Sequence, residues 1–273
     1  MFKQSIYFSV KQQTLQIWNL SIGYRRKKSE HIVARNIHST LYSGELTCLI
    51  GANGVGKSTL MRTMAALQPA LAGEIQIEKK NIATYFGNEL AKIISVVLTE
   101  RVEINNLSVF ELVSMGRSPY TGFWGTLKPE DEAIIQDALR QVGASHLSDR
   151  SVETLSDGER QKVMIAKALT QQTPVIFLDE PTAFLDFPSK VEILQMLHHL
   201  SRATGKTIFL STHDLELALQ IADTLWLMDK TRELTVGSPE KLAKSGCLEN
   251  LFSDKNVTFD RDTYCFKINT NLQ

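Results

Sequence analysis

The sequence has little that would suit a secreted or membrane-spanning protein. Its three cysteines in 273 residues, Cys48, Cys247 and Cys265, are irregularly spaced, which indicates neither a disulfide framework nor a zinc site. No run approaches the ~18 consecutive apolar residues of a transmembrane helix. The first residues also lack the apolar segment and cleavage site of a signal peptide. We therefore expect a soluble, cytoplasmic chain whose role at any membrane depends on a partner.

The sequence also lacks a net charge. Lys plus Arg and Asp plus Glu number 30 each, so the formal charge is zero. This balance argues against a protein held to nucleic acid mainly by bulk charge, and we expect no direct contact with nucleic acid. Hydrophobic residues make up 43% of the chain, which is enough for one large domain, or for a core that carries a smaller subdomain.

The hydrophobic pattern predicts an α/β protein. Residues 15–24 alternate apolar and polar side chains, as a half-buried antiparallel strand does. Further along, short apolar strands alternate with helices, which predicts a mixed, largely parallel sheet with helices on both faces. Between residues 105 and 149 strand patterns give way to helical periodicity, with the helices joined by a loop, GRSPYTGFWGTLKP. We therefore expect an N-terminal antiparallel β subdomain and an inserted α-helical subdomain.

A glycine-rich loop follows the predicted strand at residues 45–50. Gly51–Ser58 fits the pattern G-x-x-x-x-G-K-[ST], with a helix expected from Lys57. Backbone N–H groups of such a loop surround phosphate oxygens, the lysine reaches the β- and γ-phosphates, and the serine hydroxyl ligates Mg²⁺. The predicted nucleotide-binding residues here are Gly51, Ala52, Asn53, Gly54, Val55, Gly56, Lys57, Ser58 and Thr59, and Ser58 is also a predicted metal ligand.

A buried strand ends in two carboxylates at residues 174–180, PVIFLDE. Asp179 suits a magnesium ligand that acts through water, and Glu180 suits the general base that polarises the attacking water. Taken alone, the segment reads as an ordinary acidic strand end. Because it follows the phosphate loop by about 120 residues, we interpret it as part of the active site.

One segment narrows the class of nucleotide hydrolase. Leu155–Gln161, LSDGERQ, resembles the LSGGQ signature of the ATP-binding-cassette (ABC) family. Ser156 and Gly158 begin a predicted helix, which makes a second anion site at a helix N-terminus. Glu159 is a further predicted nucleotide-binding residue, and at the third helical position it also fits a capping arrangement with Ser156. Both roles can hold, because a cap and a phosphate site use the same backbone donors.

Other motifs follow in this family's order. Residues 182–186, TAFLD, resemble the D-loop, which makes Asp186 a predicted nucleotide-binding residue, and His213 resembles the switch histidine at the end of a strand. Tyr24 resembles the aromatic residue that stacks on adenine. The resemblance runs from Leu15 to about Leu242 and implies a P-loop NTPase core with ATP and Mg²⁺ as ligands. It divides the chain into an ATPase domain at 13–240, with the core at 13–100 and 158–240 and the helical subdomain at about 101–157, and a C-terminal extension at 241–273.

The resemblance also implies a dimer. In this family two nucleotides lie between two subunits, and the signature loop of one completes the site of the other. One set of motifs in this chain implies a homodimer, with Ser156 and Gly158 acting in trans, Glu180 as the catalytic base and His213 sensing the γ-phosphate. Integral-membrane permease subunits, and through them a substrate-binding protein, are the implied partners. The implied location is peripheral, on the cytoplasmic face of the inner membrane.

One position departs from the family. Glu100 stands where the loop between core and helical subdomain usually carries glutamine. A carboxylate can ligate Mg²⁺ but adds negative charge near phosphate; like unit charges ~4 Å apart repel by roughly 4 kcal/mol at an effective dielectric of 20. Either Glu100 is a metal and nucleotide ligand or it points to solvent, and the sequence leaves both interpretations open.

The cargo is suggested by residues 107–125, LSVFELVSMGRSPYTGFWG. With the LSDGERQ variant, this segment resembles importers of iron-siderophore complexes, haem and cobalamin, and we expect uptake of a ferric siderophore or related metal chelate. The alternative is a soluble cassette ATPase that acts on nucleic acid or the ribosome. The chain lacks the long coiled coils and the second cassette of such relatives. Intact Asp179, Glu180 and His213 argue against a non-hydrolysing regulator.

Overall fold

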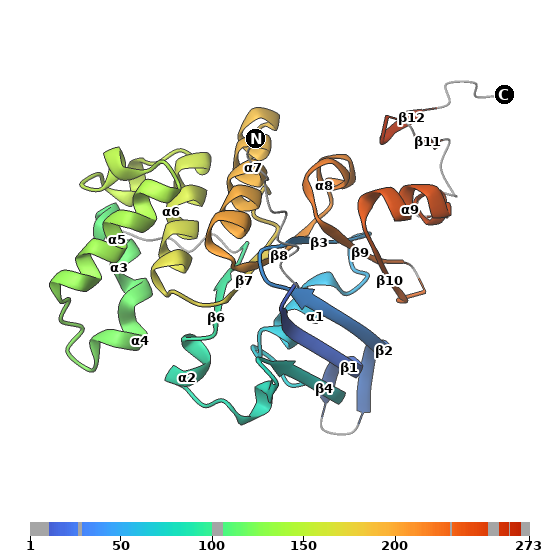
Figure 1. Cartoon of the computed structure of the whole chain (residues 1–273), viewed down its shortest axis with the longest axis horizontal. Helices are drawn as coiled ribbons and strands as arrows, with labels where there is room; N and C mark the ends of the chain where they lie inside the picture. The colour runs from blue at the N-terminus through green and yellow to red at the C-terminus, as the bar shows by residue number, and fades with distance from the viewer. Residues whose placement is uncertain are drawn as a thin grey trace, which may run out of the picture.

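The computed structural model describes residues 11–26, 29–99, 106–229, 231–250, 257–261 and 263–268 (Figure 1). The strands are β1 (Gln13–Arg26), β2 (Ser29–Tyr42), β3 (Leu46–Gly51), β4 (Ala72–Ile77), β5 (Lys80–Asn81), β6 (Ile94–Val97), β7 (Val175–Asp179), β8 (Thr207–Thr212), β9 (Thr224–Met228), β10 (Leu234–Gly237), β11 (Val257–Asp260) and β12 (Cys265–Ile268). The α-helices are α1 (Lys57–Met64), α2 (Asn88–Ala91), α3 (Val109–Ser114), α4 (Ser118–Thr121), α5 (Pro129–Gln141), α6 (Asp157–Thr170), α7 (Phe187–Thr204), α8 (Leu215–Ile221), α9 (Pro239–Ser245) and α10 (Cys247–Asn250). Short 3₁₀ helices are η1 (Ile82–Thr84), η2 (Met115–Arg117), η3 (Ser145–Leu147) and η4 (Val152–Thr154).

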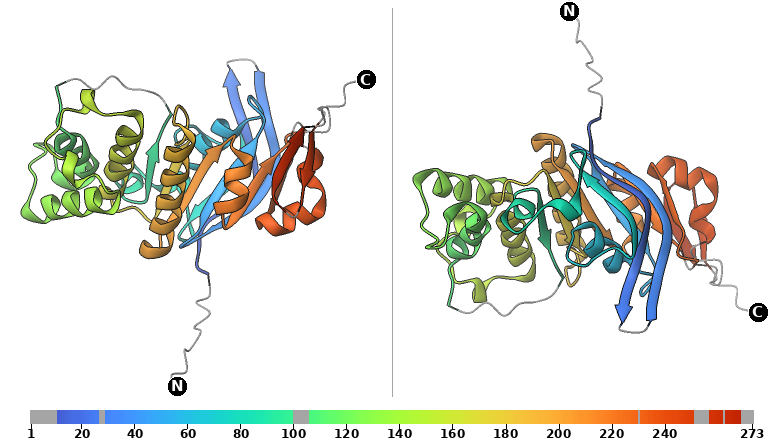
Figure 2. Two further views of the ribbon diagram at one scale, coloured as in Figure 1. Left: turned by 90° about the horizontal axis from the view of Figure 1, so that it is seen from above. Right: turned by 90° about the horizontal axis from the view of Figure 1, so that it is seen from below.

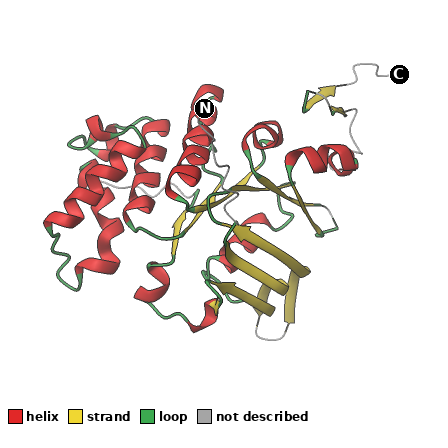
Figure 3. Ribbon diagram, viewed as in Figure 1, coloured by secondary structure: helices red, strands yellow, loops and turns green. Residues whose placement is uncertain are grey.

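The central sheet has six strands in the order β10-β9-β3-β8-β7-β6, which are labelled in Figure 1 and drawn in yellow in Figure 3. The five strands from β9 to β6 are parallel, and only β10 runs antiparallel at the edge. The carboxyl ends of the parallel strands therefore meet at one edge of the sheet, where ligands of α/β proteins bind. The largely parallel sheet predicted from the sequence is confirmed.

Both faces of this sheet are buried, which explains the continuous apolar runs of its strands. All six residues of β3 are buried. Leu46 and Cys48 point into a core shared with helices α3 and α5 to α8. Leu49 points into the opposite core, which the sheet shares with α1 and the N-terminal strands. Burial raises the pKa of the Cys48 thiol, as suits a packed side chain.

A second sheet is antiparallel, with the order β2-β1-β4-β5. Its long hairpin, β1 and β2, lies beside the core strands and is seen from two sides in Figure 2. The register places Tyr24 opposite His31. This sheet confirms the predicted N-terminal antiparallel subdomain.

The helical insertion is also confirmed, but its expected loop is partly wrong. Residues 116–121 of the segment GRSPYTGFWGTLKP lie in η2 and α4. These residues are helical because contacts with residues distant in the sequence hold them. The buried Arg117 guanidinium pairs with Asp131 at 2.8 Å and donates to the Thr170 carbonyl at 2.7 Å. A Cβ on Gly116 would stand 2.1 Å from the Thr170 hydroxyl, so the chain passes too close to the end of α6 for any other residue.

In the C-terminal extension, β11 and β12 pair as an antiparallel hairpin. Phe259, Tyr264 and Phe266 are partly buried against the main core, and the Phe266 N–H donates to Glu216 on α8 at 2.8 Å. The boundaries at residues 100, 157 and 240 between core, helical subdomain and extension remain predictions. Among the described residues, no helix combines the length and apolar character needed to cross a bilayer.

Candidate functional site

The phosphate loop joins β3 to α1 at the carboxyl edge of the central sheet. Gly54 and Gly56 adopt φ of 77° and 121°, conformations that residues with a Cβ rarely adopt. A Cβ on Gly56 would also lie 2.4 Å from a Val33 methyl carbon. No side chain caps the N-terminus of α1. Its first-turn N–H groups, with the partial positive charge of the helix end, therefore face the site with no competing side-chain acceptor.

Lys57 lies folded into this loop. Its Nζ donates to the Gly51 carbonyl at 2.8 Å and to the Ala52 carbonyl at 3.4 Å, and the residue is 6% exposed. Burial lowers the pKa of the ammonium group, and the charges of Glu180 and Asp179 partly oppose that shift. A polyphosphate would supply the stronger counter-charge that this buried lysine lacks.

Two of the predicted metal ligands, Ser58 and Asp179, lie close together beside the loop. The Ser58 hydroxyl lies 3.4 Å from Asp179 Oδ1, and Asp179 is buried at the end of β7. Hydroxyl and carboxylate oxygens are the ligands that Mg²⁺ prefers, with its other positions filled by water and phosphate oxygens. The described residues contain no group of three or more His, Cys, Asp or Glu side chains able to hold a metal. The donor set fits Mg²⁺.

Ser211 supports both acidic residues, although no sequence motif singles it out. Its fully buried hydroxyl donates to Asp179 Oδ1 at 2.6 Å and accepts the Glu180 N–H at 3.0 Å. Asp179 and Ser211 are register partners on β7 and β8. The Thr99 hydroxyl donates to the Asp179 carbonyl at 2.6 Å, which fixes the same strand end from the other side.

Glu180 directly follows the last residue of β7. Its φ is 47°, in the left-handed region that costs a residue with a Cβ about 1–2 kcal/mol. His213 Nδ1 lies 3.5 Å from Glu180 Oε2, so the two predicted catalytic residues are neighbours. Glu180 remains partly exposed, with 26% of its side chain accessible. A carboxylate in this position is open to solvent in the pocket beside the phosphate loop.

A pocket of about 430 Å³ collects many of the predicted residues. It is lined by Tyr24, His31, Val33, Asn53, Gly54, Gly56, Lys57, Ser58, Thr59, Glu180 and Arg232. The Tyr24 hydroxyl lies 2.9 Å from the Thr59 hydroxyl, which links the predicted adenine-stacking residue to the first turn of α1. Some of the predicted residues around the phosphate loop do not line the pocket. They are Gly51, Ala52 and Val55 in the loop itself, and Asp179 and His213 at neighbouring strand ends. His31 and Arg232 are not among the residues predicted from motifs.

The predicted signature residues lie away from this pocket. Ser156 caps α6, and its hydroxyl accepts the Glu159 N–H at 3.3 Å. The Glu159 carboxylate in turn accepts the Ser156 N–H at 2.8 Å, and this bond lowers the pKa of Glu159. A Cβ on Gly158 would make only ordinary contacts, so packing within one chain does not explain this glycine. Action in trans stays a prediction.

Two further predicted residues have different outcomes. Asp186 caps α7 and accepts the Ser189 N–H at 3.1 Å. Hydrogen bonds from the Ser189 hydroxyl and N–H lower the pKa of the Asp186 carboxyl. The structure therefore shows Asp186 as the N-cap of α7, and its contact with nucleotide stays a prediction. Glu100 lies outside the described residues.

Comparisons with known proteins identify the family. A family model described as ABC transporter matches residues 34–183. An uncharacterised ABC transporter ATP-binding protein of Methanocaldococcus jannaschii is 38% identical over 257 residues, with 94% of this chain and 87% of the relative covered. The ferric enterobactin transport ATP-binding protein of Escherichia coli is 32% identical, with 88% of each chain covered. A solved structure of a putative metal-chelate type ABC transporter in an inward-facing conformation superposes with a TM-score of 0.76 at 25% identity, covering 94% of this chain and 96% of the other.

Proposed function

This chain is an ATPase of the ABC transporter family, and from that premise we propose that it is the ATP-hydrolysing subunit of an importer for an iron-siderophore or related metal chelate. It acts as a homodimer beneath a separate membrane permease. One observation carries the catalytic part: the pocket brings Tyr24, the phosphate loop and Glu180 together. The cargo class is supported by relatives named for ferric enterobactin and iron(3+)-hydroxamate transport.

The residues of one chain bind and orient the nucleotide. The phosphate loop surrounds the β- and γ-phosphates with backbone N–H groups, and Lys57 exchanges its carbonyl partners for phosphate oxygens. Tyr24 stacks on the base. Ser58 and Asp179 hold Mg²⁺, which when bound neutralises charge that develops on the phosphates.

Hydrolysis then depends on Glu180. Its carboxylate orients and deprotonates the water that attacks the γ-phosphorus, and the β–γ bridging oxygen leaves with the ADP. Ser211 fixes the Glu180 backbone by accepting its N–H, and His213 stands 3.5 Å from the Glu180 carboxylate, where it can contact the γ-phosphate. A second copy contributes Ser156 and Gly158 across the nucleotide, so dimer closure and opening follow ATP binding and hydrolysis.

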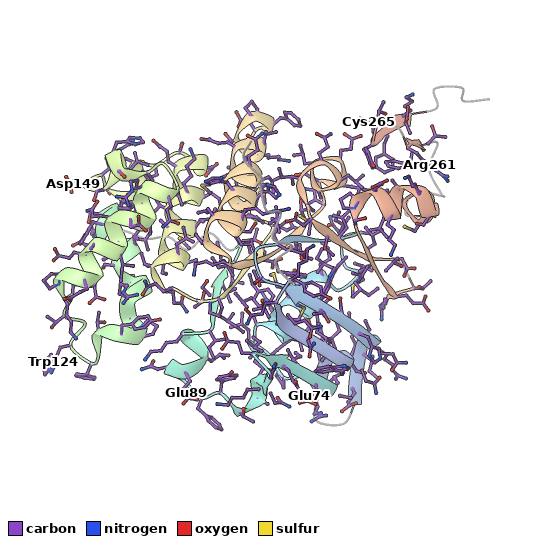
Figure 4. All side chains as sticks on the ribbon, viewed as in Figure 1. Glu74, Glu89, Trp124, Asp149, Arg261 and Cys265 are labelled. Atoms are coloured by element: carbon purple, nitrogen blue, oxygen red, sulfur yellow. The ribbon has the colours of Figure 1, made fainter. Side chains whose placement is uncertain are left out.

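An exposed aromatic pair supports a protein partner. Phe123 and Trp124 are 94% and 87% exposed and touch edge to face, with ring centroids 5.4 Å apart. Trp124 projects from the end of the helical region in Figure 4. Two adjacent exposed rings indicate an interaction surface. We assign this surface to the permease side, which places the chain peripherally at the cytoplasmic face of the inner membrane, with a substrate-binding protein as an indirect partner.

Membrane fractionation of the native cell tests the proposal. The chain, captured after chemical cross-linking, is expected to bring down a multi-spanning membrane protein. Deleting the chain is expected to abolish ATP-dependent uptake of a ferric chelate, and a Glu180→Gln copy is expected not to restore uptake. Recovery of ribosomes or DNA in place of a membrane protein would support the soluble alternative and reject the importer.

A further inference from the structure

One wall of the nucleotide pocket comes from residues that belong to no nucleotide-binding motif. His31 lies on β2, and Arg232 lies in the connection between β9 and β10, two hundred residues further along the chain. The β1–β2 hairpin and the β9–β10 pair nevertheless lie side by side (Figure 1). Both residues line the same pocket as Tyr24 and Lys57, and Arg232 also borders the neighbouring hollow beside β2.

The turn that carries Arg232 is held by one carboxylate. Asp229 Oδ1 accepts the Thr231 hydroxyl at 2.6 Å and the Glu233 N–H at 3.1 Å, and the Asp229 carbonyl accepts the Arg232 N–H at 3.0 Å. Within this turn Arg232 has a φ of 68°. A left-handed backbone at an arginine is unfavourable, and here the surrounding hydrogen bonds maintain it. The turn thereby presents this side chain toward β2.

The guanidinium group is anchored but largely unused. Its Nη1 donates to the Ile32 carbonyl at 3.1 Å. No carboxylate in the described part of the chain lies within ion-pair distance of it. A guanidinium carries five N–H donors, so most of them remain available to a ligand in the pocket.

The position of Arg232 identifies the part of the nucleotide it faces. Ile32 follows His31, and His31 is the register partner of Tyr24. Tyr24 contacts Thr59 in the first turn of α1, whereas Lys57 reaches back to the Gly51 carbonyl at the other end of the loop. Arg232 therefore stands at the Tyr24 end of the pocket, away from the site of the terminal phosphate.

We propose that Arg232 recognises the nucleoside part of the bound nucleotide, donating from its guanidinium to acceptor atoms of the base or ribose while Tyr24 stacks on the base. This inference rests on the proposed ATP site. Because the nucleoside is the same in ATP, ADP and the transition state, the contact contributes equally to all three. Loss of the guanidinium therefore raises the KM for ATP and leaves kcat unchanged.

The test compares ligands with and without a nucleoside. Dissociation constants of MgATP, MgADP and inorganic tripolyphosphate are measured by calorimetry for the wild type, Arg232→Ala and Arg232→Gln. For both variants we expect binding of MgATP and MgADP to weaken by about 10- to 100-fold, the effect of losing a charged hydrogen bond, and tripolyphosphate binding to stay the same. Arg35→Ala is the matched control: Arg35 is an exposed arginine on β2 that lines a neighbouring hollow but not the nucleotide pocket.

Two results would overturn the inference. One is unchanged nucleotide affinity in both Arg232 variants. The other is tripolyphosphate binding weakened by the same factor as MgATP, which would make Arg232 a phosphate contact. A wild-type chain that binds no MgATP would instead reject the proposed ATP site, so the two failures are distinguishable. Thermal melting without ligand verifies that the variants fold, and the exposed turn predicts that they do.

Discussion

Helices α1 and α6 both begin at a predicted phosphate site, but their N-termini differ. At α1 the capping position is Gly56, and no side chain accepts a first-turn N–H. At α6 the capping position is Ser156, and a complete capping box with Glu159 satisfies the helix end. The Ser156 hydroxyl itself lies 3.0 Å from the Glu159 carboxylate.

The difference in capping predicts how the N-termini of α1 and α6 bind an anion. The α1 end holds its donors in place before any ligand arrives, as preorganised binding requires. At the α6 end a carboxylate already occupies the donors that a γ-phosphate would use. Phosphate binding there requires the Glu159 side chain to move, so we expect the α1 end to bind nucleotide first and the α6 end to respond only when a dimer forms.

Helix α3 provides an internal reference for the α6 end. Ser108 and Glu111 form the same capping box, with the Ser108 N–H donating to Glu111 at 2.7 Å and the Glu111 N–H donating to the Ser108 hydroxyl at 3.2 Å. No nucleotide role is predicted for this pair. It therefore separates the effect of losing a helix cap from the effect of losing a phosphate contact.

The largest expected effect comes from Glu180→Gln. Loss of the general base should lower ATP turnover by about 10²–10⁴-fold, while the intact phosphate loop still binds MgATP. The variant should accumulate as an ATP-loaded dimer, the state in which the two helix ends face one nucleotide. Phosphate release and light scattering measure the two effects. Wild-type turnover in this variant would remove Glu180 from the catalytic role.

Lys57→Ala should have the next largest effect. The change removes the buried cation of the α1 end, so MgATP affinity should fall by about 10- to 100-fold, as for other charged hydrogen bonds. Equilibrium binding to the monomer at low protein concentration is the measurement. If the monomer of this variant bound MgATP normally, the α1 end would not be the preformed site. Lys244→Ala, at an exposed lysine whose partner Glu240 is also exposed, serves as the control.

Ser156→Ala and Ser108→Ala form a matched pair with smaller effects. Each should lower the free energy of unfolding by about 1 kcal/mol through the loss of a helix cap. Only Ser156→Ala should also reduce turnover, by about tenfold, since only that hydroxyl is predicted to meet the γ-phosphate of the partner site. Urea unfolding and ATPase assays compare them. Equal turnover in the two variants would leave Ser156 with a structural role alone.

Sequence patterns predicted the parts of the site that are local. The phosphate loop and the pair Asp179 and Glu180 each follow a buried strand, and their positions depend on a few neighbouring residues. Ser211 and Arg232 escape such patterns, because their roles arise from the pairing of β7 with β8 and from a contact with β2. The helical turn at Arg117 could not be predicted from local patterns for the same reason. Arg117 is held by Asp131 and by the end of α6, which lie further along the sequence.

The smallest expected effect is a pH dependence, and it tests the comparison most directly. Hydrogen bonds from Ser156 lower the pKa of Glu159, and those from Ser108 lower the pKa of Glu111. Each ionised carboxylate thus contributes stability that is present above its unfolded-state pKa, about 4.3, and is lost as the pH falls through the lower folded-state value. Glu159→Gln and Glu111→Gln should each flatten the fall in Tm between about pH 5 and pH 3.

The two variants should differ in dimerisation, measured in the Glu180→Gln background. Only Glu159→Gln should lower the ATP concentration at which that background dimerises, by a few-fold. The amide is a weaker acceptor than the carboxylate, so it releases the Ser156 donors to the phosphate. A dimerisation midpoint that responds equally to both changes would mean that the α6 end is only a cap.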